Sequence, residues 1–165
     1  MKIIITNGIA QSGKDTVARM LSERMKVVKL SSIDGIKALA RKVGWNGIKD
    51  ERSRKFLSDL KLLLSAYNDY PFEYIKQKVH ECPYDAIVLI DIREPNEIAK
   101  AADYFDAITV LVQRDSVKQI TSNFSDANVY DYEYQYCVNN NGSLDDLKIE
   151  VDKLAAYINS VEENR

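Results

Sequence analysis

Short apolar runs alternate along the chain with longer segments in which apolar residues recur every three or four positions. A short run rich in β-branched residues predicts a buried strand. Strands are expected at residues 2–6, 27–30, 86–91, 107–112 and, from an alternating pattern, 130–138. The run at 86–91 is apolar throughout until it ends in Asp91, which is typical of a parallel sheet covered on both faces.

The periodic segments predict helices, and these alternate with the strands. They are expected at residues 14–25, 33–43, 50–67, 71–82, 95–104 and from Ser143 onward, with a weak helix or loop at 115–124. The helix at 50–67 is expected to bury Phe56, Leu57, Leu60, Leu63 and Leu64. The last helix is expected to bury Leu144, Leu147, Val151, Leu154 and Ile158. This alternation predicts an α/β domain with a mainly parallel sheet.

Length and composition narrow the class of protein. A chain of 165 residues with 45% hydrophobic and 29% charged residues suits a single folded domain spanning residues 1–165 and excludes a disordered chain. No apolar run approaches the length of a membrane span, and no secretory signal pattern follows Met1. Cys82 and Cys137 have neither disulfide-framework nor metal-motif spacing, so we expect reduced thiols in a cytoplasmic protein.

The net charge of −2 conceals an asymmetry between the two halves of the chain. Residues 1–80 contain 16 Lys and Arg against 8 Asp and Glu, whereas residues 81–165 contain 7 against 17. A basic half favours an anionic ligand. That ligand would be either nucleic acid or phosphates. Because the basic residues are spread out and not interleaved with aromatic residues, a solvated helix face explains much of the excess.

The segment with the clearest chemistry is residues 8–16, Gly-Ile-Ala-Gln-Ser-Gly-Lys-Asp-Thr. It has the spacing of a phosphate loop, Gly, four residues, Gly, Lys, and it stands between a predicted strand and a predicted helix. The glycines let backbone N–H groups turn toward one concavity, where the helix N-terminus adds positive potential. Lys14 supplies a mobile charge for the β and γ phosphates.

Two carboxylates are candidates for a metal. Asp15 follows Lys14 where Ser or Thr is usual, and it either binds Mg²⁺, directly or through water, or is an ordinary first-turn carboxylate. Asp91 ends a predicted strand, and ligands of open α/β sheets lie beyond the carboxyl ends of the strands. Asp91 is therefore expected to order Mg²⁺ or its waters, and Arg93 to bind a substrate phosphate with its two-pronged guanidinium.

Five segments, in order and over nearly the whole chain, resemble phage-type deoxynucleoside monophosphate kinases. Residues 12–18 resemble the phosphate loop of these kinases, and 91–97, Asp-Ile-Arg-Glu-Pro-Asn-Glu, resembles their Asp-Val-Arg-Phe-Pro-Asn-Glu. Asp34 and Lys37 resemble the start of the helix after the second strand. The remaining matches are Gly44-Trp45 with residues 49–54, and 138–144, which contains an Asn-Gly-Ser-Leu also seen in dephosphocoenzyme A kinases.

The resemblance implies a three-layer P-loop kinase fold with a five-stranded parallel sheet of order 2-3-1-4-5 and flanking helices. It implies acceptor-binding helices at about 33–80 and a short lid at about 114–129. The activity implied is ATP- and Mg²⁺-dependent phosphoryl transfer to a (deoxy)nucleoside monophosphate, giving the diphosphate. Its partners would be small-molecule nucleotides, without nucleic acid or membrane, and the sequence leaves the oligomeric state open, a homodimer included.

The resemblance also implies roles for individual residues. ATP would be held by Gly8, Gln11, Ser12, Gly13, Lys14, Asp15, Thr16, Arg114 and Asn141. The acceptor would be held by Asp34, Lys37, Arg54 and Arg93, and the metal by Asp15 and Asp91. The catalytic residues would be Lys14, Asp91, Arg93 and Arg114.

The sequence departs from the family in three places. Gly35 stands where the family often has Pro, and residues 123–126 read Asn-Phe-Ser-Asp where the family often has His-x-Ser-Glu. Arg114 and Lys118 are the only cationic residues between Gln113 and Gly142. Related kinases use lid arginines to neutralise transition-state charge. The Arg-poor lid supports one alternative, a nucleotide-binding module with weak turnover. A second alternative is a kinase of phosphomevalonate or dephosphocoenzyme A, since kinases of those acceptors share the short phosphate loop.

Aromatic residues leave two local alternatives open. Tyr130, Tyr132, Tyr134 and Tyr136 alternate with polar residues and form either a stacking surface for adenine or one packed face of a strand. Trp45 either lines the monophosphate pocket or anchors a loop.

Overall fold

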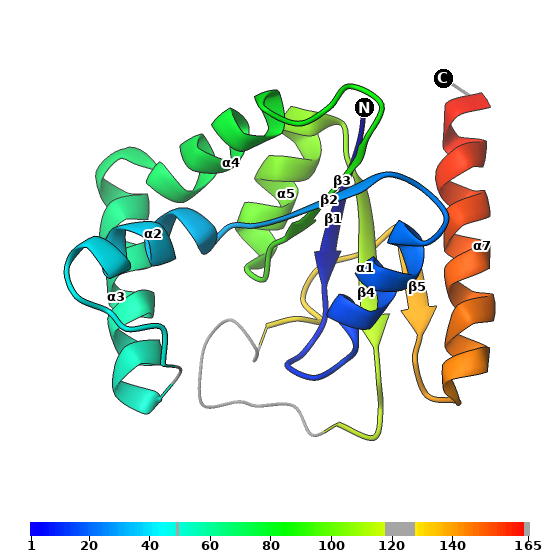
Figure 1. Cartoon of the computed structure of the whole chain (residues 1–165), viewed down its shortest axis with the longest axis horizontal. Helices are drawn as coiled ribbons and strands as arrows, with labels where there is room; N and C mark the ends of the chain where they lie inside the picture. Colours follow the sequence, from blue (N-terminus) through cyan, green and yellow to red (C-terminus); the bar gives the residue numbers. More distant parts are fainter. Residues whose placement is uncertain (49, 118–127, 164–165) are drawn as a thin grey trace. The chain divides into compact units, whose positions relative to one another are not determined.

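A computed structural model describes residues 1–48, 50–117 and 128–163. One sheet contains the five strands β1 (Lys2–Asn7), β2 (Val27–Ser31), β3 (Ile87–Asp91), β4 (Ile108–Gln113) and β5 (Tyr136–Asn139). Their order is β2-β3-β1-β4-β5, as Figure 1 shows, which confirms the predicted order 2-3-1-4-5. The first four predicted strands are confirmed to within one residue at each end.

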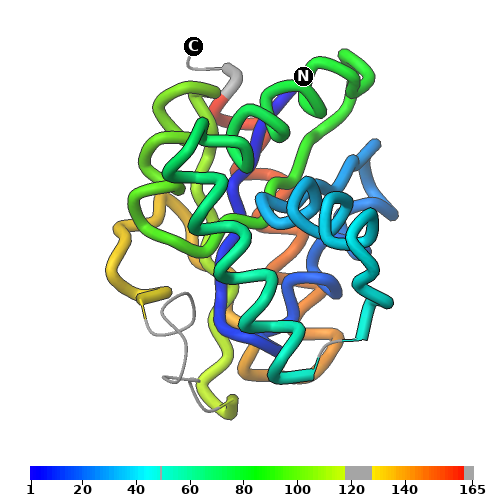
Figure 2. Tube along the Cα trace, turned by 90° about the vertical axis from the view of Figure 1, so that its left-hand side faces the viewer, coloured from blue at the N-terminus to red at the C-terminus, as the bar shows by residue number. Residues whose placement is uncertain are grey.

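The chain divides into two compact units, which we describe separately. The first unit comprises Met1–Lys29 and Pro83–Arg165, and the second comprises Leu30–Cys82. The second unit contains α2 (Asp34–Lys42), α3 (Glu51–Asn68) and α4 (Tyr70–His80), whose trace can be followed in Figure 2. These are the helices predicted to bind the acceptor. No helix among the described residues is both long enough and apolar enough to cross a bilayer.

Helices cover both faces of the sheet in the first unit (Figure 1). Along β1, Ile4 pairs with Leu89 on one side and with Ile108 on the other. From one face, α1 (Lys14–Ser22) and α7 (Leu144–Glu163) pack on these strands through Val17, Met20, Leu21, Leu147, Val151, Leu154 and Ile158. On the other face α5 (Pro95–Phe105) contacts β1 and β4 and buries Ile98 and Ala101. Each large aliphatic side chain so buried stabilises the fold by about 1.5–3 kcal/mol.

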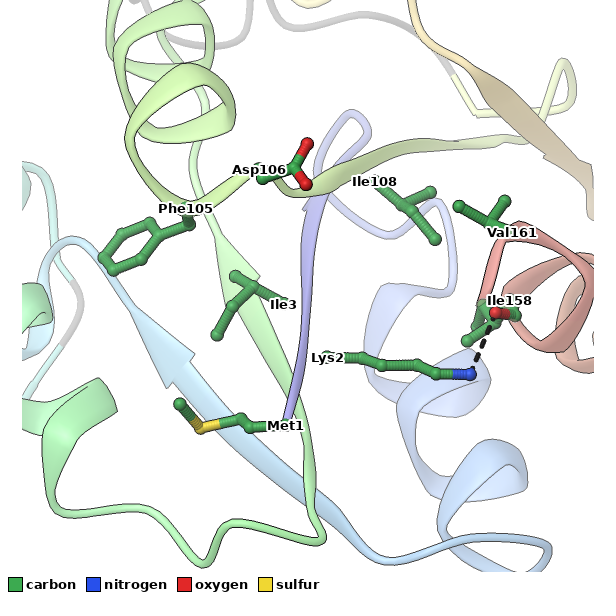
Figure 3. Close-up of a pocket in the computed structure, with 8 residues that line it drawn as sticks. All are labelled: Met1, Lys2, Ile3, Phe105, Asp106, Ile108, Ile158 and Val161. Atoms are coloured by element: carbon green, nitrogen blue, oxygen red, sulfur yellow. Dashed lines mark hydrogen bonds between the residues drawn. The ribbon is translucent and has the colours of Figure 1, made fainter. Parts of the chain in front are cut away.

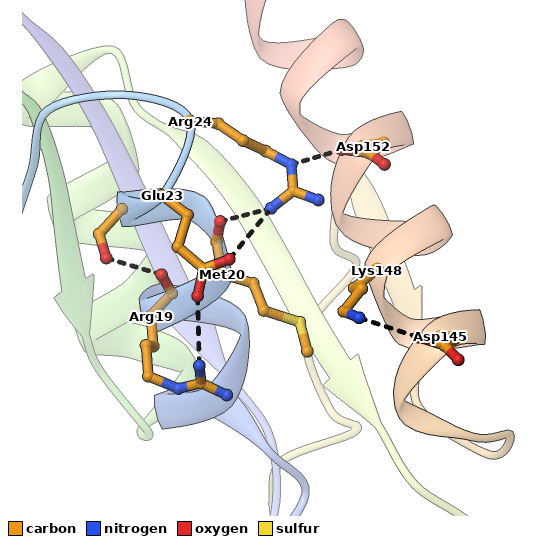
Figure 4. Close-up of polar contacts among 8 residues, drawn as sticks. Arg19, Met20, Glu23, Arg24, Asp145, Lys148 and Asp152 are labelled. Carbon is orange, nitrogen blue, oxygen red and sulfur yellow. Dashed lines mark hydrogen bonds and ion pairs between the residues drawn. The ribbon is translucent and has the colours of Figure 1, made fainter.

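One ion pair joins the segment just after α1 to α7 at the surface (Figure 4). The Arg24 guanidinium pairs with Asp152 of α7 and donates a 2.6 Å hydrogen bond to the carbonyl of Met20. The hydrogen bond to Asp152 raises the pKa of Arg24 above its ordinary value. Exposed pairs of this kind add little stability, so the buried apolar stripe of α7 determines how the two helices pack.

The predicted fifth strand, residues 130–138, is wrong in extent, because β5 begins only at Tyr136. Before it, Gln135 and Thr109 bond each other through their side chains. The backbone N–H of Gln135 donates to Thr109 Oγ1 at 3.1 Å, and the backbone N–H of Thr109 donates to Gln135 Oε1 at 3.0 Å. These side-chain contacts replace the strand ladder. Residues 128–131 form a turn in which the Asp131 N–H donates to the carbonyl of Asn128.

The predicted buried side of α3 is also wrong, because α3 has no fully buried residue. Phe56 is 37% exposed and Leu63 is 66% exposed. Helical geometry places Leu57, Leu60 and Leu64 together and puts Phe56 and Leu63 on the flank of that stripe, so helices packed on the stripe leave the flank in solvent. The last helix buries its predicted stripe except at Leu144, which lies in its first turn and is 64% exposed.

A prediction concerns Gly35 of α2, which lies against α4. A Cβ added at Gly35 would lie 2.7 Å from Cγ of Tyr74 and 3.1 Å from Cε1 of Tyr70. This close approach explains a glycine inside a helix. Overpacking costs about 1–3 kcal/mol, whereas the higher helix propensity of alanine returns about 1 kcal/mol.

Gly35→Ala is therefore expected to lower the free energy of unfolding by about 1 kcal/mol, measured by urea denaturation. Ser58→Ala, at an exposed position of α3, is the control and should leave stability unchanged or slightly higher. A Gly35→Ala protein as stable as the parent would show that α2 and α4 do not need this contact.

Candidate active site

The predicted phosphate loop joins the end of β1 to the start of α1. Gly8 has φ +151°, and a Cβ there would lie 2.4 Å from the backbone oxygen of Val112. Gly13 has φ +103°, and a Cβ there would lie 2.3 Å from Nδ2 of Asn140. Both positions therefore require glycine, for backbone conformation and for space. The loop has the strand–loop–helix setting that phosphate binding demands.

Ser12 lies within this loop and is fully buried. Its backbone is held on both sides, since its N–H donates to the carbonyl of Ile9 at 3.1 Å and its carbonyl accepts from Asn140 Nδ2 at 2.8 Å. Its Oγ is the one buried side-chain polar atom among the described residues without a hydrogen-bond partner. A buried hydroxyl without a partner is costly. An unsatisfied polar atom in this loop fits a site that is completed by a polar ligand.

Lys14 is the first residue of α1, and its ammonium lies against the loop. Nζ donates to the carbonyl of Ile9 at 3.1 Å and to the carbonyl of Gly8. The loop therefore holds one positive charge at the N-terminus of a helix, where the helix dipole is also positive. These features fit the phosphates of ATP.

Asp15 and Asp91 are brought together by a lysine that the sequence analysis missed. Lys29 Nζ lies 3.1 Å from Oδ2 of Asp91 and also pairs with Oδ1 of Asp15. The hydroxyl of Thr6 donates to the other oxygen of Asp91 at 2.5 Å. Burial lowers the pKa of Lys29, but its hydrogen bonds and ion pairs with the two carboxylates outweigh that effect and raise it overall. The available signal was a single lysine within the otherwise apolar strand 27–30.

These residues fit Mg²⁺ only in part. The described residues contain no cluster of three or more His, Cys, Asp or Glu side chains that could hold a metal. Mg²⁺ usually binds through one or two carboxylates, keeps several waters and takes further oxygens from substrate phosphates. The oxygens of Asp15 and Asp91 suit such a cation when it arrives with a nucleotide. Direct metal contact by Asp15 stays a prediction.

Asn7, which the sequence analysis also missed, fixes the start of the loop. It is fully buried, and its Oδ1 accepts from the Gly8 N–H at 2.8 Å. Its Nδ2 donates to the carbonyl of Arg93 at 3.1 Å and to the Tyr134 hydroxyl at 2.7 Å. That hydroxyl donates to the carbonyl of Val129 at 2.8 Å. Asn7 thus links the phosphate loop to the segments that follow β3 and precede β5.

The same contacts help to decide between the two interpretations of Tyr130, Tyr132, Tyr134 and Tyr136. Tyr134 packs beside the buried cluster of Ile9, Leu111 and Val129, and its ring lies edge-on to that of Tyr132. Tyr136 packs against Tyr157 of α7, with ring centroids 4.9 Å apart. These contacts support the packed-face interpretation for Tyr134 and Tyr136.

Tyr134 leads to a prediction about pH. Burial raises the pKa of Tyr134 to about 12, although the hydrogen bond from Asn7 opposes this. An unfolded tyrosine ionises near pH 10. Because the folded state keeps its proton longer, the stabilising effect is fully present below about pH 10 and is lost as pH rises from about 10 to about 12.

Urea unfolding between pH 9 and 12 measures this loss. Tyr134→Phe should give a shallower fall in the free energy of unfolding than the parent, and Tyr130→Phe, at an exposed tyrosine, should match the parent. If the free energy of unfolding falls equally steeply with pH in the parent and in Tyr134→Phe, the loss of stability does not come from Tyr134.

The remaining predicted residues of the first unit are placed as follows. The carbonyl of Arg93 is held by Asn7, and its side chain is partly exposed just beyond β3. Arg114 is exposed directly after β4. Asn141 bonds Asp115, accepting from its N–H at 2.6 Å and donating to its Oδ2 at 2.8 Å, whereas the neighbouring Asn140 holds the phosphate loop. Nucleotide contact by Asn141 stays a prediction. Lys118, residues 123–126 and most of the predicted lid lie outside the described residues.

The predicted acceptor residues Asp34, Lys37 and Arg54 lie in the second unit. Asp34 Oδ2 accepts from the Ser31 N–H at 2.9 Å, and its Oδ1 lies 3.3 Å from Lys37 Nζ. Arg54 is exposed in the first turns of α3. Lys49 lies outside the described residues.

Trp45, in the same unit, closes the loop after α2. Its Nε1 donates to the carbonyl of Ile48 at 3.0 Å, and the Arg41 guanidinium lies 5.4 Å from its ring centroid. These contacts support the anchoring interpretation of Trp45.

A cavity of about 270 Å³ lies at the other end of β1 (Figure 3). Met1, Lys2 and Ile3 line it together with residues from the end of α5 and from α7. Lys2 Nζ donates to the carbonyl of Ile158 at 3.0 Å beside it. It lies at the amino end of β1, whereas the phosphate loop follows the carboxyl end, so it takes no part in the candidate site.

No protein-family model matches the chain, and no curated protein matches it. Among solved structures, the crystal structure of TT1252 from Thermus thermophilus is 21% identical with a TM-score of 0.56, covering 94% of this chain and 97% of that one. Shikimate kinase from Aquifex aeolicus is 15% identical with a TM-score of 0.51, covering 98% and 97%. Thymidylate kinase from Candida albicans is 13% identical with a TM-score of 0.51, covering 99% and 93%. Together with the strand order, these likenesses establish that the chain has the P-loop kinase fold.

Proposed function

We propose that the protein transfers the γ-phosphoryl group of ATP to a nucleoside monophosphate, with deoxynucleotides as the preferred acceptors. The observation that carries this proposal is the phosphate loop with Lys14 at the same sheet edge as Asp91. Residues 91–97, which resemble the strand-end motif of deoxynucleoside monophosphate kinases, support the choice of acceptor.

Each part of the loop has a role in holding ATP. Backbone N–H groups between Gly8 and Lys14 would bind phosphate oxygens, and the unpartnered Ser12 hydroxyl offers a further donor. Lys14 would move from its loop carbonyls to the β and γ phosphates. Mg²⁺, when bound, neutralises phosphate charge, and Asp15 and Asp91 are the residues that would hold it. Catalysis of this type consists of alignment and charge neutralisation.

The acceptor would be bound by cations near its phosphate. Arg93 follows the carboxyl end of β3, and the bond from Asn7 to its carbonyl fixes the backbone that carries it. Asp34, Lys37 and Arg54 are proposed as further acceptor contacts, and Arg114 as the cation that stabilises the transferring group.

Two features favour the cytoplasm as the compartment of this enzyme: its free cysteines and its proposed use of ATP. Cys82 is half-buried, Cys137 is exposed, and both are free thiols. Free thiols suit a reducing compartment. We therefore place the enzyme in the cytoplasm, where ATP and nucleotides are available.

A coupled assay of ADP release tests the proposal. The protein is incubated with ATP, Mg²⁺ and a panel of nucleoside monophosphates, their nucleosides, phosphomevalonate and dephosphocoenzyme A. We expect ADP release with at least one deoxynucleoside monophosphate and none with the nucleosides. Release with phosphomevalonate or dephosphocoenzyme A alone would support the other-acceptor alternative. ATP binding without release for any acceptor would support a binding module with weak turnover.

A further inference from the structure

The position of the Lys29 ammonium indicates what fills the candidate metal position before ATP binds. Its ammonium lies between the two carboxylates proposed to hold Mg²⁺, 3.1 Å from Oδ2 of Asp91 and paired with Oδ1 of Asp15. The carboxylates come from the start of α1 and the end of β3, and the lysine comes from the middle of β2. Three separate parts of the chain thus contribute to one small charged cluster.

The chemistry of this cluster requires a cation. The Asp91 side chain is only 19% exposed, whereas that of Asp15 is 91% exposed, and a positive charge between them offsets the repulsion of the two carboxylates. The hydroxyl of Thr6 donates to Oδ1 of Asp91 and leaves Oδ2 facing the ammonium. A lysine ammonium is a compact point charge on a flexible stem, so it can occupy such a position and also leave it.

We propose that Lys29 is a built-in counter-ion that occupies the divalent-cation position while the nucleotide site is empty and gives it up when the metal–nucleotide complex binds. The proposal rests on the function proposed above, because that function assigns Asp15 and Asp91 to the metal. It makes Lys29 a positioning residue that keeps the two carboxylates together. It also means that the protein without nucleotide should bind divalent cations weakly, so that the metal enters with ATP.

The test is Mn²⁺ binding to the full chain without nucleotide, measured by calorimetry. Lys29→Met removes the charge and keeps the aliphatic stem, and Lys29→Arg keeps the charge. Lys26→Met is the matched control, because Lys26 lies just before the same strand and pairs with Asp85 at 2.7 Å. We expect Lys29→Met to bind Mn²⁺ at least about tenfold more tightly than the parent, since two carboxylates lose their internal cation. Lys29→Arg and Lys26→Met should bind as the parent does.

A double variant tests whether the gain in Mn²⁺ affinity arises at the carboxylates that Lys29 contacts. Adding Asp91→Asn to Lys29→Met should abolish the gain in Mn²⁺ affinity. If Lys29→Met does not fold, Lys29→Gln replaces it, with the same expectation. Mn²⁺ should also raise the Tm of the Lys29 variant more than that of the parent.

Two results would overturn the proposal. One is unchanged or weaker Mn²⁺ binding by the uncharged Lys29 variant that folds. The other is a gain that persists when Asp91→Asn is added. Because the measurement uses neither ATP nor acceptor, it is independent of kinase activity. A failed ADP-release assay would count against the proposed reaction, whereas unchanged Mn²⁺ binding in an active kinase would count against the role of Lys29 alone.

Discussion

Lys14→Ala is expected to lower kcat/KM for ATP-dependent phosphoryl transfer by on the order of 10³ or more. The Lys14 ammonium lies on the loop carbonyls of Gly8 and Ile9, within reach of phosphates held by the same loop. Charge that develops on the transferring phosphoryl group is stabilised by fixed cations, and a 10³-fold loss corresponds to about 4 kcal/mol of transition-state stabilisation. Steady-state kinetics with ATP, Mg²⁺ and the preferred monophosphate measure the loss.

The fold should survive this change, because the partly exposed Lys14 side chain is no part of the buried apolar core. Lys153→Ala is the matched control, since Lys153 of α7 pairs with Glu150 at an exposed position. The control should keep the activity of the parent. Activity of Lys14→Ala within tenfold of the parent would remove the phosphate-loop lysine from the mechanism.

Arg93→Ala is expected to raise the KM for the acceptor by roughly 30-fold to 10³-fold, with little change in ATP affinity. A bidentate contact between arginine and phosphate is worth about 2–4 kcal/mol in a partly closed site. The structural part of Arg93 is its backbone carbonyl, which accepts from Asn7, and alanine keeps that carbonyl. The effect should therefore be confined to the guanidinium.

Calorimetry with ATP and with the monophosphate, separately, measures the two affinities. Arg93→Lys should restore part of the acceptor affinity, because it keeps the charge and loses the two-pronged geometry. Arg19→Ala, at an exposed residue of α1 that pairs with Glu23, is the control and should change neither affinity. If Arg93→Ala loses ATP binding and keeps monophosphate binding, Arg93 belongs to the ATP site and not to the acceptor site.

The sequence was sufficient to predict the sheet because its core strands are short apolar runs. The runs at 2–6 and 86–91 are buried in the structure as adjacent, parallel β1 and β3. The phosphate loop at residues 8–16 could also be predicted from the sequence, because its glycines and lysine have a fixed spacing and lie between a strand and a helix. Local pattern and tertiary structure agree wherever one chain segment determines the outcome.

The sequence was insufficient where segments far apart in the chain meet. Lys29 is distant in sequence from Asp91, and no local pattern reports their 3.1 Å contact. Asn7 lies just after the predicted strand 2–6, and its three hydrogen bonds become visible only when Arg93 and Tyr134 are placed beside it. The alternation at residues 130–138 suggested a longer strand, but residues 128–131 form a turn and Gln135 bonds Thr109 through side-chain oxygens.

The central claim is that the phosphoryl group passes from ATP to a monophosphate. The most direct measurement is a ³¹P NMR time course of one sample that contains the protein, ATP, Mg²⁺ and the monophosphate that releases most ADP. We predict that the γ-phosphate signal of ATP falls while the signals of ADP and of the acceptor diphosphate rise in equal amounts, and that Lys14→Ala shows neither change. Formation of inorganic phosphate without any acceptor diphosphate, or an unchanged ATP signal with every monophosphate, would contradict the claim.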